Sequence, residues 1–233
     1  MDRLDAKLKP RLNVLQPDQL EEVYSAALEV LEQTGIKITH PRALELLDGC
    51  GARIDGNRVH IPDYLIKEAL RKAPSRIVLG TRNGQRSLQL ERNKTYFGTS
   101  LDCLDYLEPF TGERRDFRLD DCSTLSRMLD AMDNYSWGMT FGIARDVDPE
   151  LADRMVLKAA MTHSQKPMVF CCKDIASLKD IYEMGVLISG GETNFFKAPT
   201  LALLTDPISP LVLTDDTVEK MMFCAEKRIP QIC

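Results

Sequence analysis

The stretch of residues 95–115, TYFGTSLDCLDYLEPFTGERR, combines aromatic rings, carboxylates and short hydroxyl groups, and it contains neither His nor Lys. Tyr96 precedes Asp102 by six residues, with Thr99 and Ser100 between them. An aromatic face attracts a cation through its quadrupole, so rings beside a carboxylate suit a permanently charged ammonium group that has no N–H to donate. The same pattern is also typical of a hairpin edge whose rings cover the core and whose acidic groups are solvated.

Other residues that could bind a metal or take part in catalysis are dispersed along the chain. His40, His60 and His163 lie far apart in the sequence, so we expect this chain to bind no metal. Cys171 and Cys172 end a predicted strand, where neighbouring side chains point to opposite faces and at most one can face a pocket. A role as small apolar filler is as compatible with this pair as a role in a site.

The composition is that of a globular protein with an ordinary core. Of 233 residues, 44% are apolar and 28% are charged, and 30 basic residues against 35 acidic ones give a net charge of −5, which disfavours nucleic acid as a partner. No apolar stretch approaches the roughly 18 residues that a membrane span needs, and the N-terminus is charged, so we expect a soluble protein with no membrane partner. Seven Cys, an odd number, favour reduced thiols and a cytoplasmic location.

The first part of the chain, residues 1–118, alternates predicted helices with hairpins. In residues 17–35, Pro17 suits a first helical turn, Leu20, Val23 and Leu28 belong to an apolar stripe, and Gly35 can end the helix, so we expect a packed helix. Two further helices are expected in PRALELLDGCG and PDYLIKEALRKAP. Hairpins are expected around the Asp-Gly pair of ARIDGNRVHI, the Asn-Gly pair of RIVLGTRNGQRSLQL and the Thr-Gly pair of LDYLEPFTGERRDFRL.

The second part, residues 119–233, repeats a short apolar run followed by an amphipathic helix. The runs are NYSWGMTFG, KPMVFCC, APTLALLTD and IPQIC, and Pro167, Pro199 and Pro230 open the last three at intervals of 32 and 31 residues. Such a period is typical of β-α units in a parallel sheet, and Pro is tolerated at the start of a strand. The Gly-Gly pair of ISGGETNFF follows a predicted helix, so we interpret it as a helix cap and not as a phosphate loop.

The even period, without a glycine-rich phosphate turn, favours a (β/α)8 TIM barrel over a doubly wound sheet within the α/β class. The fold we predict is therefore the first part of a TIM barrel, preceded by an N-terminal α+β region of helices and hairpins. A complete barrel needs about 250 residues for its eight units. Since the last run stops inside a predicted strand, we expect this chain to be the N-terminal part of a longer protein.

Several motifs of the chain resemble the trimethylamine methyltransferase family of corrinoid-dependent methyltransferases. The likeness extends over essentially the whole chain. Its most specific parts are the TG-I helix end, GARIDGNRVHIP with the following EALRKAP, and TGERR leading into an acidic helix start. The resemblance implies a (β/α)8 barrel that moves a methyl group from a methylated amine to the Co(I) form of cobalamin, which a separate corrinoid protein carries.

The resemblance leaves two substrate classes open. Members that act on trimethylamine have pyrrolysine in their C-terminal half, beyond Cys233, whereas many relatives lack it and use quaternary amines such as glycine betaine. We prefer a glycine betaine-like quaternary amine, because relatives without pyrrolysine are abundant. Its tertiary amine leaves as a neutral group, so no general acid is required and the lack of His and Lys in residues 95–115 is no objection.

The resemblance and the strand ends together give a predicted substrate site. The expected partners are a corrinoid protein and a small methylated amine, and we also expect a homo-oligomer. Two other functions stay open, a non-catalytic module that binds betaine or the corrinoid protein, and an unrelated barrel enzyme such as an aldolase, for which Lys173 lies one residue past a strand. The predicted substrate-binding residues are Tyr96, Thr99, Ser100, Asp102, Phe141, Phe170 and Thr205.

Overall fold

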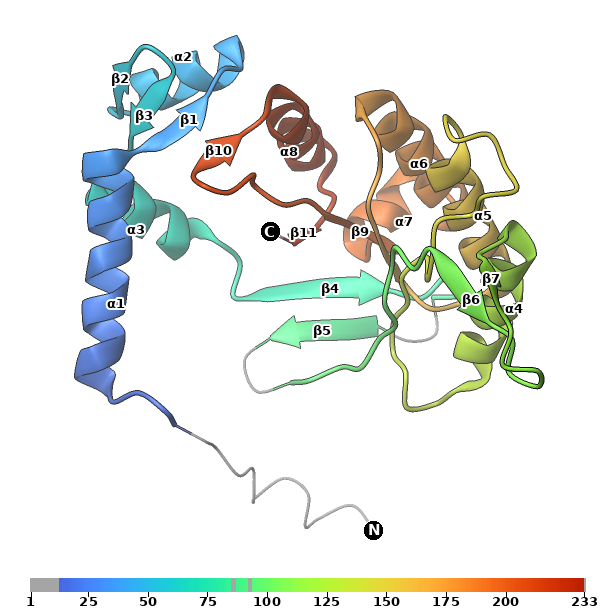
Figure 1. The fold of residues 1–233 in the computed structure, drawn as a ribbon. Coiled ribbons are helices and arrows are strands. Elements are labelled where there is room, and N and C mark those ends of the chain that lie inside the picture. The colour runs from blue at the N-terminus through green and yellow to red at the C-terminus, as the bar shows by residue number, and fades with distance from the viewer. Residues whose placement is uncertain (1–12, 85–86, 92–93, 233) are drawn as a thin grey trace. The chain divides into compact units, whose positions relative to one another are not determined.

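The structure is a computed structural model that describes residues 13–84, 87–91 and 94–232, shown in Figure 1. The chain divides into two compact units, one up to Lys72 and one from Ala73. It is a mixed α/β protein in which helices alternate with small sheets. The sequence-based boundary at residue 118 stays a prediction about domains.

The first unit contains small helices and a three-stranded antiparallel arrangement in which β3 pairs with both β1 and β2. Its elements are α1 (Pro17–Glu29), a π-helical turn η1 (Val30–Thr34), β1 (Ile36–Ile38), α2 (Pro41–Gly49), β2 (Arg53–Asp55), β3 (Arg58–His60) and α3 (Asp63–Lys72). The three predicted helices and the first hairpin are thereby confirmed. The turn of that hairpin is one residue later than expected, because Asp55 pairs with Arg58 and leaves Gly56 and Asn57 in the loop.

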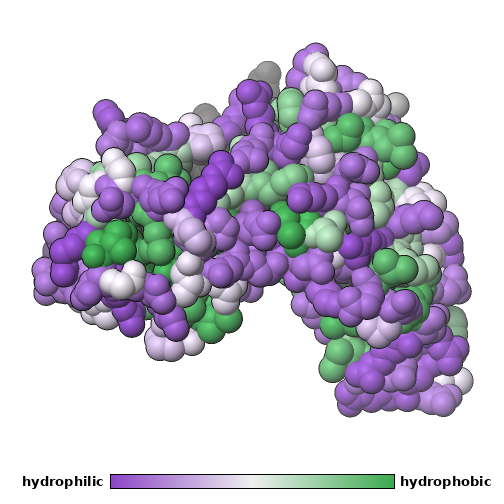
Figure 2. Space-filling view, turned by 90° about the horizontal axis from the view of Figure 1, so that it is seen from above, coloured by the Kyte–Doolittle hydropathy of each residue, from purple (hydrophilic) through white to green (hydrophobic). Residues whose placement is uncertain are grey.

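The predicted first helix is only partly packed. As expected, Pro17 opens α1, and Gly35 ends the π-turn in a left-handed conformation with φ of 72°. Leu28 is buried, whereas Leu20 and Val23 are 55% and 61% exposed. The apolar stripe therefore extends beyond the face that the described residues cover. More generally, hydrophobic patches interrupt the hydrophilic surface, as seen in Figure 2.

The second unit runs from β4 to β11, from turquoise to red in Figure 1. The elements in its first half are β4 (Arg76–Gly80), β5 (Ser87–Glu91), β6 (Asp105–Leu107), β7 (Arg114–Asp116), α4 (Leu119–Ala131) and α5 (Ala152–His163). Those in its second half are β8 (Met168–Phe170), α6 (Ile175–Ile188), α7 (Glu192–Lys197), β9 (Leu201–Leu204), β10 (Val212–Leu213), α8 (Asp215–Lys227) and β11 (Gln231–Ile232). The predicted second and third hairpins form as β4/β5 and β6/β7.

Five successive segments of the second unit lie parallel to one another. β8 pairs with β9 and β9 pairs with β11, as the apolar repeat predicts. Residues 135–142 add to β8 through a single parallel bridge between Gly138 and Met168, and residues 97–103 add to residues 135–142 through two more. The run NYSWGMTFG is thus an irregular strand that pairs only through isolated bridges, and near its end Phe141 has a positive φ of 65°.

The two faces of this parallel arrangement are covered differently. Met168, Phe170 and Leu203 belong to the core that packs against the helices. Val169 and Ala202 lie in a second core with side chains of the β4/β5 hairpin. Because successive side chains of a strand alternate between faces, this split follows from the register. Both faces of the strands are therefore covered. A binding site is instead expected at the ends of the strands, where the residues that follow each strand lie.

Candidate functional site

The carboxyl ends of the parallel segments meet at one edge, where ligands bind in parallel α/β folds. A cavity of about 260 Å³ lies there, and we name it the rim cavity. Residues 97–103 contribute Asp102, residues 135–142 contribute Thr140 and Gly142, the residues after β8 contribute Cys171 to Lys173, and α5 contributes Asp153. Segments that are far apart in the sequence therefore share this wall.

Asp102 is the carboxylate of this wall that has no protein partner. Asp102 is exposed, and its carboxylate has no hydrogen bond or ion pair within the described part of the chain. The surrounding protein desolvates the charged form and thereby raises the pKa of Asp102 above its ordinary value. An unpaired carboxylate at the mouth of a cavity can accept a cationic ligand without first breaking an internal ion pair.

The backbone that carries Asp102 is held in an uncommon conformation. Asp102 and Phe141 have φ values of 61° and 65°, a region that residues other than glycine seldom adopt. The segments are joined on both sides of these residues, since Cys103 N donates to Phe141 O at 3.1 Å and Phe141 N donates to Ser100 O at 3.1 Å. Phe97 pairs with Tyr135 and Cys103 with Gly142, which leaves one extra residue on the second segment, as in a bulge.

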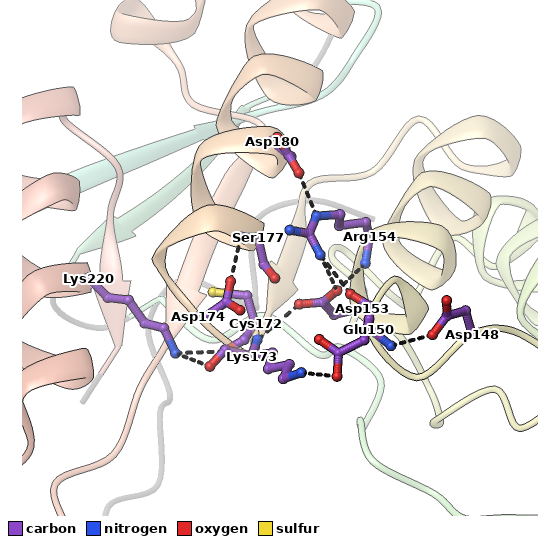
Figure 3. A network of polar contacts seen from close by, with 10 residues as sticks. All are labelled: Asp148, Glu150, Asp153, Arg154, Cys172, Lys173, Asp174, Ser177, Asp180 and Lys220. Atoms are coloured by element: carbon purple, nitrogen blue, oxygen red, sulfur yellow. Dashed lines mark hydrogen bonds and ion pairs between the residues drawn. The ribbon is translucent and has the colours of Figure 1, made fainter.

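The chain after β8 is fixed by hydrogen bonds to its backbone, which Figure 3 shows from close by. Asp153 Oδ2 accepts a hydrogen bond from Lys173 N at 2.9 Å. Lys220 Nζ, which is buried, donates to Cys172 O at 2.7 Å and to Lys173 O at 3.0 Å, and it forms an ion pair with Asp216. The side chain of Lys173 takes no part in these contacts and pairs with Glu150 at the surface.

The adjacent thiols of the wall are kept neutral. Burial, followed by the nearby carboxylates of Asp102 and Asp206, raises the pKa of Cys171 to about 11. Burial also raises the pKa of Cys172 to about 12, although the Lys220 charge acts in the opposite direction. Only the thiolate is a good nucleophile, so both residues are poor nucleophiles near neutral pH.

The seven predicted substrate-binding residues are not all brought together. Asp102 lines the rim cavity, while Ser100 and Phe141 line neighbouring cavities beside α4. Thr99 Oγ1 accepts a hydrogen bond from Met139 N at 2.8 Å and so joins the two irregular segments. Their roles in binding stay predictions.

The remaining three predicted residues have evident packing partners. Tyr96 packs beside the β4/β5 hairpin, where its hydroxyl accepts a hydrogen bond from Gln89 N at 3.3 Å. Phe170 is completely buried on the face that packs against the helices. Thr205 N donates to Ile232 O at 3.0 Å and thereby continues the ladder between β9 and β11.

Sequence reasoning did not assign Asp153 or Lys220 to this site. Asp153 lies in the first turn of α5, where an acidic residue is expected on grounds of helix stability alone. Lys220 lies in the middle of α8, 48 residues after Cys172. The sequence offers no local signal for such a contact. Among residues 13–84, 87–91 and 94–232, no group of three or more His, Cys, Asp or Glu side chains is arranged to hold a metal ion.

The family model described as trimethylamine methyltransferase (MTTB) matches residues 4–233. Because the match covers nearly the whole chain, the protein belongs to the trimethylamine methyltransferase family, which confirms the resemblance noted in its motifs. A protein of Desulfitobacterium hafniense (strain DSM 10664 / DCB-2), described as trimethylamine methyltransferase MttB, is 28% identical over 181 residues. The alignment covers 77% of this chain and 36% of that relative, so the chain spans about a third of the relative's length. Within the described part of the chain, no helix is both long and apolar enough to cross a membrane.

Proposed function

We propose that this chain forms the substrate-binding part of a methyltransferase that takes a methyl group from a quaternary amine such as glycine betaine. The acceptor in this proposal is the Co(I) corrinoid of a separate corrinoid protein. Family membership supports the reaction class. The observation that supports a cationic substrate is the unpaired carboxylate of Asp102, which lines the rim cavity.

The proposed fold is the first part of a (β/α)8 barrel. Residues 97–103, residues 135–142, β8, β9 and β11 succeed one another as parallel neighbours, and each connection contains at least one helix, with two (α6 and α7) between β8 and β9. This succession is what a barrel requires of consecutive strands. The rim cavity would then lie at the carboxyl end of the barrel, where a corrinoid protein can approach the substrate methyl group.

In this reaction the residues of the chain bind and orient the substrate, and none of them has to transfer a proton. A quaternary nitrogen carries a fixed positive charge, which Asp102 offsets, and its tertiary amine leaves without a proton. The cobalt of the partner's corrinoid supplies the nucleophile, so the protein binds and orients the substrate. Because Cys171 and Cys172 remain protonated, neither thiol competes with cobalt for the methyl group.

Trimethylamine is the second candidate substrate, favoured by the name of the Desulfitobacterium relative. The alternative to an enzyme is a non-catalytic module that binds betaine or the corrinoid protein. Cytoplasmic location and a homo-oligomeric state remain predictions.

Methyl transfer by the full-length protein tests the proposal. The protein is incubated with glycine betaine or trimethylamine and a Co(I) corrinoid protein, and methylcobalamin is followed by its absorbance. We expect methylcobalamin with glycine betaine, and Asp102→Asn to slow its formation at limiting substrate. Binding of glycine betaine without transfer to any corrinoid protein would instead support the module, and transfer from trimethylamine alone would move the assignment to that amine.

A further inference from the structure

Lys173 is the one basic residue among the described residues that line the rim cavity. A quaternary ammonium ion alone has no use for a positive group in its pocket, since the two charges repel. A zwitterion such as a betaine also carries a carboxylate, and that group needs a cation or hydrogen-bond donors when it leaves water. The charge pattern of the wall therefore bears on which amines can bind.

The two carboxylates of the wall are not equivalent. Asp153 is mostly buried and already occupied, because its oxygens accept from Lys173 N at 2.9 Å and Arg154 N at 2.7 Å, and the Arg154 guanidinium lies 3.7 Å away. Asp102 has no such partner within the described residues. The ammonium end of a ligand is thus directed to Asp102, while its other end is left to the Lys173 part of the wall.

The position of Lys173 is fixed although its side chain is free to exchange partners. Hydrogen bonds from Lys220 and to Asp153 hold the backbone on both sides of the residue, as Figure 3 shows. The side chain itself is 48% exposed and pairs with Glu150, which is 70% exposed. An exposed ion pair of this kind contributes at most about 1 kcal/mol, so a substrate carboxylate bound in the rim cavity can replace Glu150.

We propose that Lys173 binds the carboxylate of a zwitterionic substrate and makes the rim cavity selective for betaines over amines that lack a carboxylate. This inference rests on the proposed function, in which Asp102 receives the ammonium end. Lys173 is then a specificity-determining residue. It has no part in the methyl transfer itself, which requires only that the methyl carbon face the cobalt.

Titration calorimetry of the full-length protein with two probes tests this inference. Glycine betaine carries both charges, and tetramethylammonium carries only the cation. We expect Lys173→Met to weaken the binding of glycine betaine at least tenfold and to leave tetramethylammonium affinity within about twofold of wild type. Lys173→Arg should retain most of the glycine betaine affinity. Lys179→Met, at an exposed position of α6 away from the cavity, is the matched control and should change neither.

The outcomes separate this inference from the proposed function. If Lys173→Met binds glycine betaine as wild type does, or loses both probes equally, the role of Lys173 is refuted while amine binding stands. If wild-type protein binds neither probe, the proposed function itself fails. Glu150→Gln supplies an independent readout, because removing the competing carboxylate should strengthen glycine betaine binding and leave tetramethylammonium unchanged. Weaker glycine betaine binding in Glu150→Gln would contradict the exchange of partners.

Discussion

The ammonium group of Lys220 on α8 donates a hydrogen bond of 2.7 Å to the carbonyl oxygen of Cys172 at the end of β8. The same group donates to Lys173 O, and it is almost fully buried. This contact ties a helix to the strand end that forms part of the rim cavity. It gives two carbonyl groups just after the strand a charged hydrogen-bond donor.

We predict that Lys220→Met lowers the free energy of unfolding by about 2–3 kcal/mol, because a buried charged donor is lost and two carbonyls are left unpaired. Urea denaturation followed by circular dichroism measures the change. Lys179→Met, an exposed substitution on α6, should stay within about 0.5 kcal/mol of wild type. Equal stabilities of Lys220→Met and wild type would show that the strand end does not depend on this contact.

The binding of a quaternary cation should depend on the ionisation of Asp102. Desolvation raises its pKa, so as the pH falls the carboxylate loses its charge at a higher pH than an ordinary Asp does. We predict constant tetramethylammonium affinity near neutral pH and a decline on acidification, measured by calorimetry. Asp102→Asn should weaken binding about fivefold, since a partly solvated charge pair contributes about 1 kcal/mol, and should abolish the decline.

The same substitution has an opposite expected effect on stability. A carboxyl group whose pKa is raised by folding destabilises the folded state at every pH above that value. Asn also tolerates the left-handed conformation that Asp102 adopts. We therefore predict that Asp102→Asn leaves the melting temperature unchanged or raises it slightly at pH 7. A clear fall would mean that the carboxylate caps the local backbone, and it would favour a structural role over binding.

Arg115 should hold the β6/β7 hairpin against the start of α4. Its guanidinium donates to both oxygens of Asp121 at 2.7 Å, to Glu108 at 2.7 Å, and lies over the ring of Tyr106. Lys cannot reproduce this planar fork, so Arg115→Lys should lower the melting temperature by about a few degrees. Arg114→Lys is the matched control, because Arg114 is more exposed and contacts Asp105 alone. Equal effects of the two variants would contradict a special role for Arg115.

Acid should weaken the same contact. The hydrogen bonds from Arg115 lower the pKa of Asp121, so its stabilising effect is complete above the pKa of the unfolded chain and is lost as the pH falls through the lower folded value. The melting difference between wild type and Arg115→Lys should therefore shrink below about pH 4. A difference that persists unchanged at low pH would assign it to the contacts of Arg115 that do not titrate, stacking on Tyr106 and the hydrogen bond to Asp116 O.

The thiols of the rim cavity should resist alkylation. With pKa values of about 11 and 12, Cys171 and Cys172 carry little thiolate at pH 8. We predict that iodoacetamide modifies the exposed Cys50 and Cys103 first, as read by peptide mass spectrometry, and that denaturant removes the difference. Rapid modification of Cys171 in the folded protein would overturn the inference that these thiols do not compete for methyl groups.

Gly98 should be difficult to replace. A Cβ atom on Gly98 would lie 2.2 Å from Cε2 of Trp137, whose ring is held by a hydrogen bond from its Nε1 to Tyr96 O. We predict that Gly98→Ala destabilises the protein by about 1–3 kcal/mol through overpacking. Gly49→Ala is the control, since a Cβ there would contact nothing within 4 Å. Similar urea midpoints for the two variants would indicate that Trp137 moves easily.

The sequence predicts much of this fold because local signals mark its elements. The turns at Asn83–Gly84 and Thr111–Gly112 bring about the predicted hairpins, and Gly190 and Gly191 end α6 as expected. The strand-like role of residues 97–103 was missed, because it rests on isolated bridges to residues 135–142. The short helix α7 was missed as well, since it directly follows the glycines that signal an end.

The site was less accessible to prediction than the fold. Asp102 could be selected from its aromatic neighbours, and it does line the rim cavity. Which face of β8 carries Phe170 depends on register, and an apolar run without alternation does not reveal it. The contact between Lys220 and Cys172 joins residues 48 positions apart, so it emerges only from packing.

The hydrogen bonds that hold the backbone after β8 determine which amino-acid substitutions the protein tolerates there. Lys220 and Asp153 form hydrogen bonds with main-chain atoms of residues 172 and 173, and any residue except proline at position 173 can keep these bonds. A point mutation at position 173 alters the charge of the cavity wall while the hydrogen-bonded backbone stays in place. The charge of this wall can therefore change through single substitutions at position 173 that leave the surrounding fold stable.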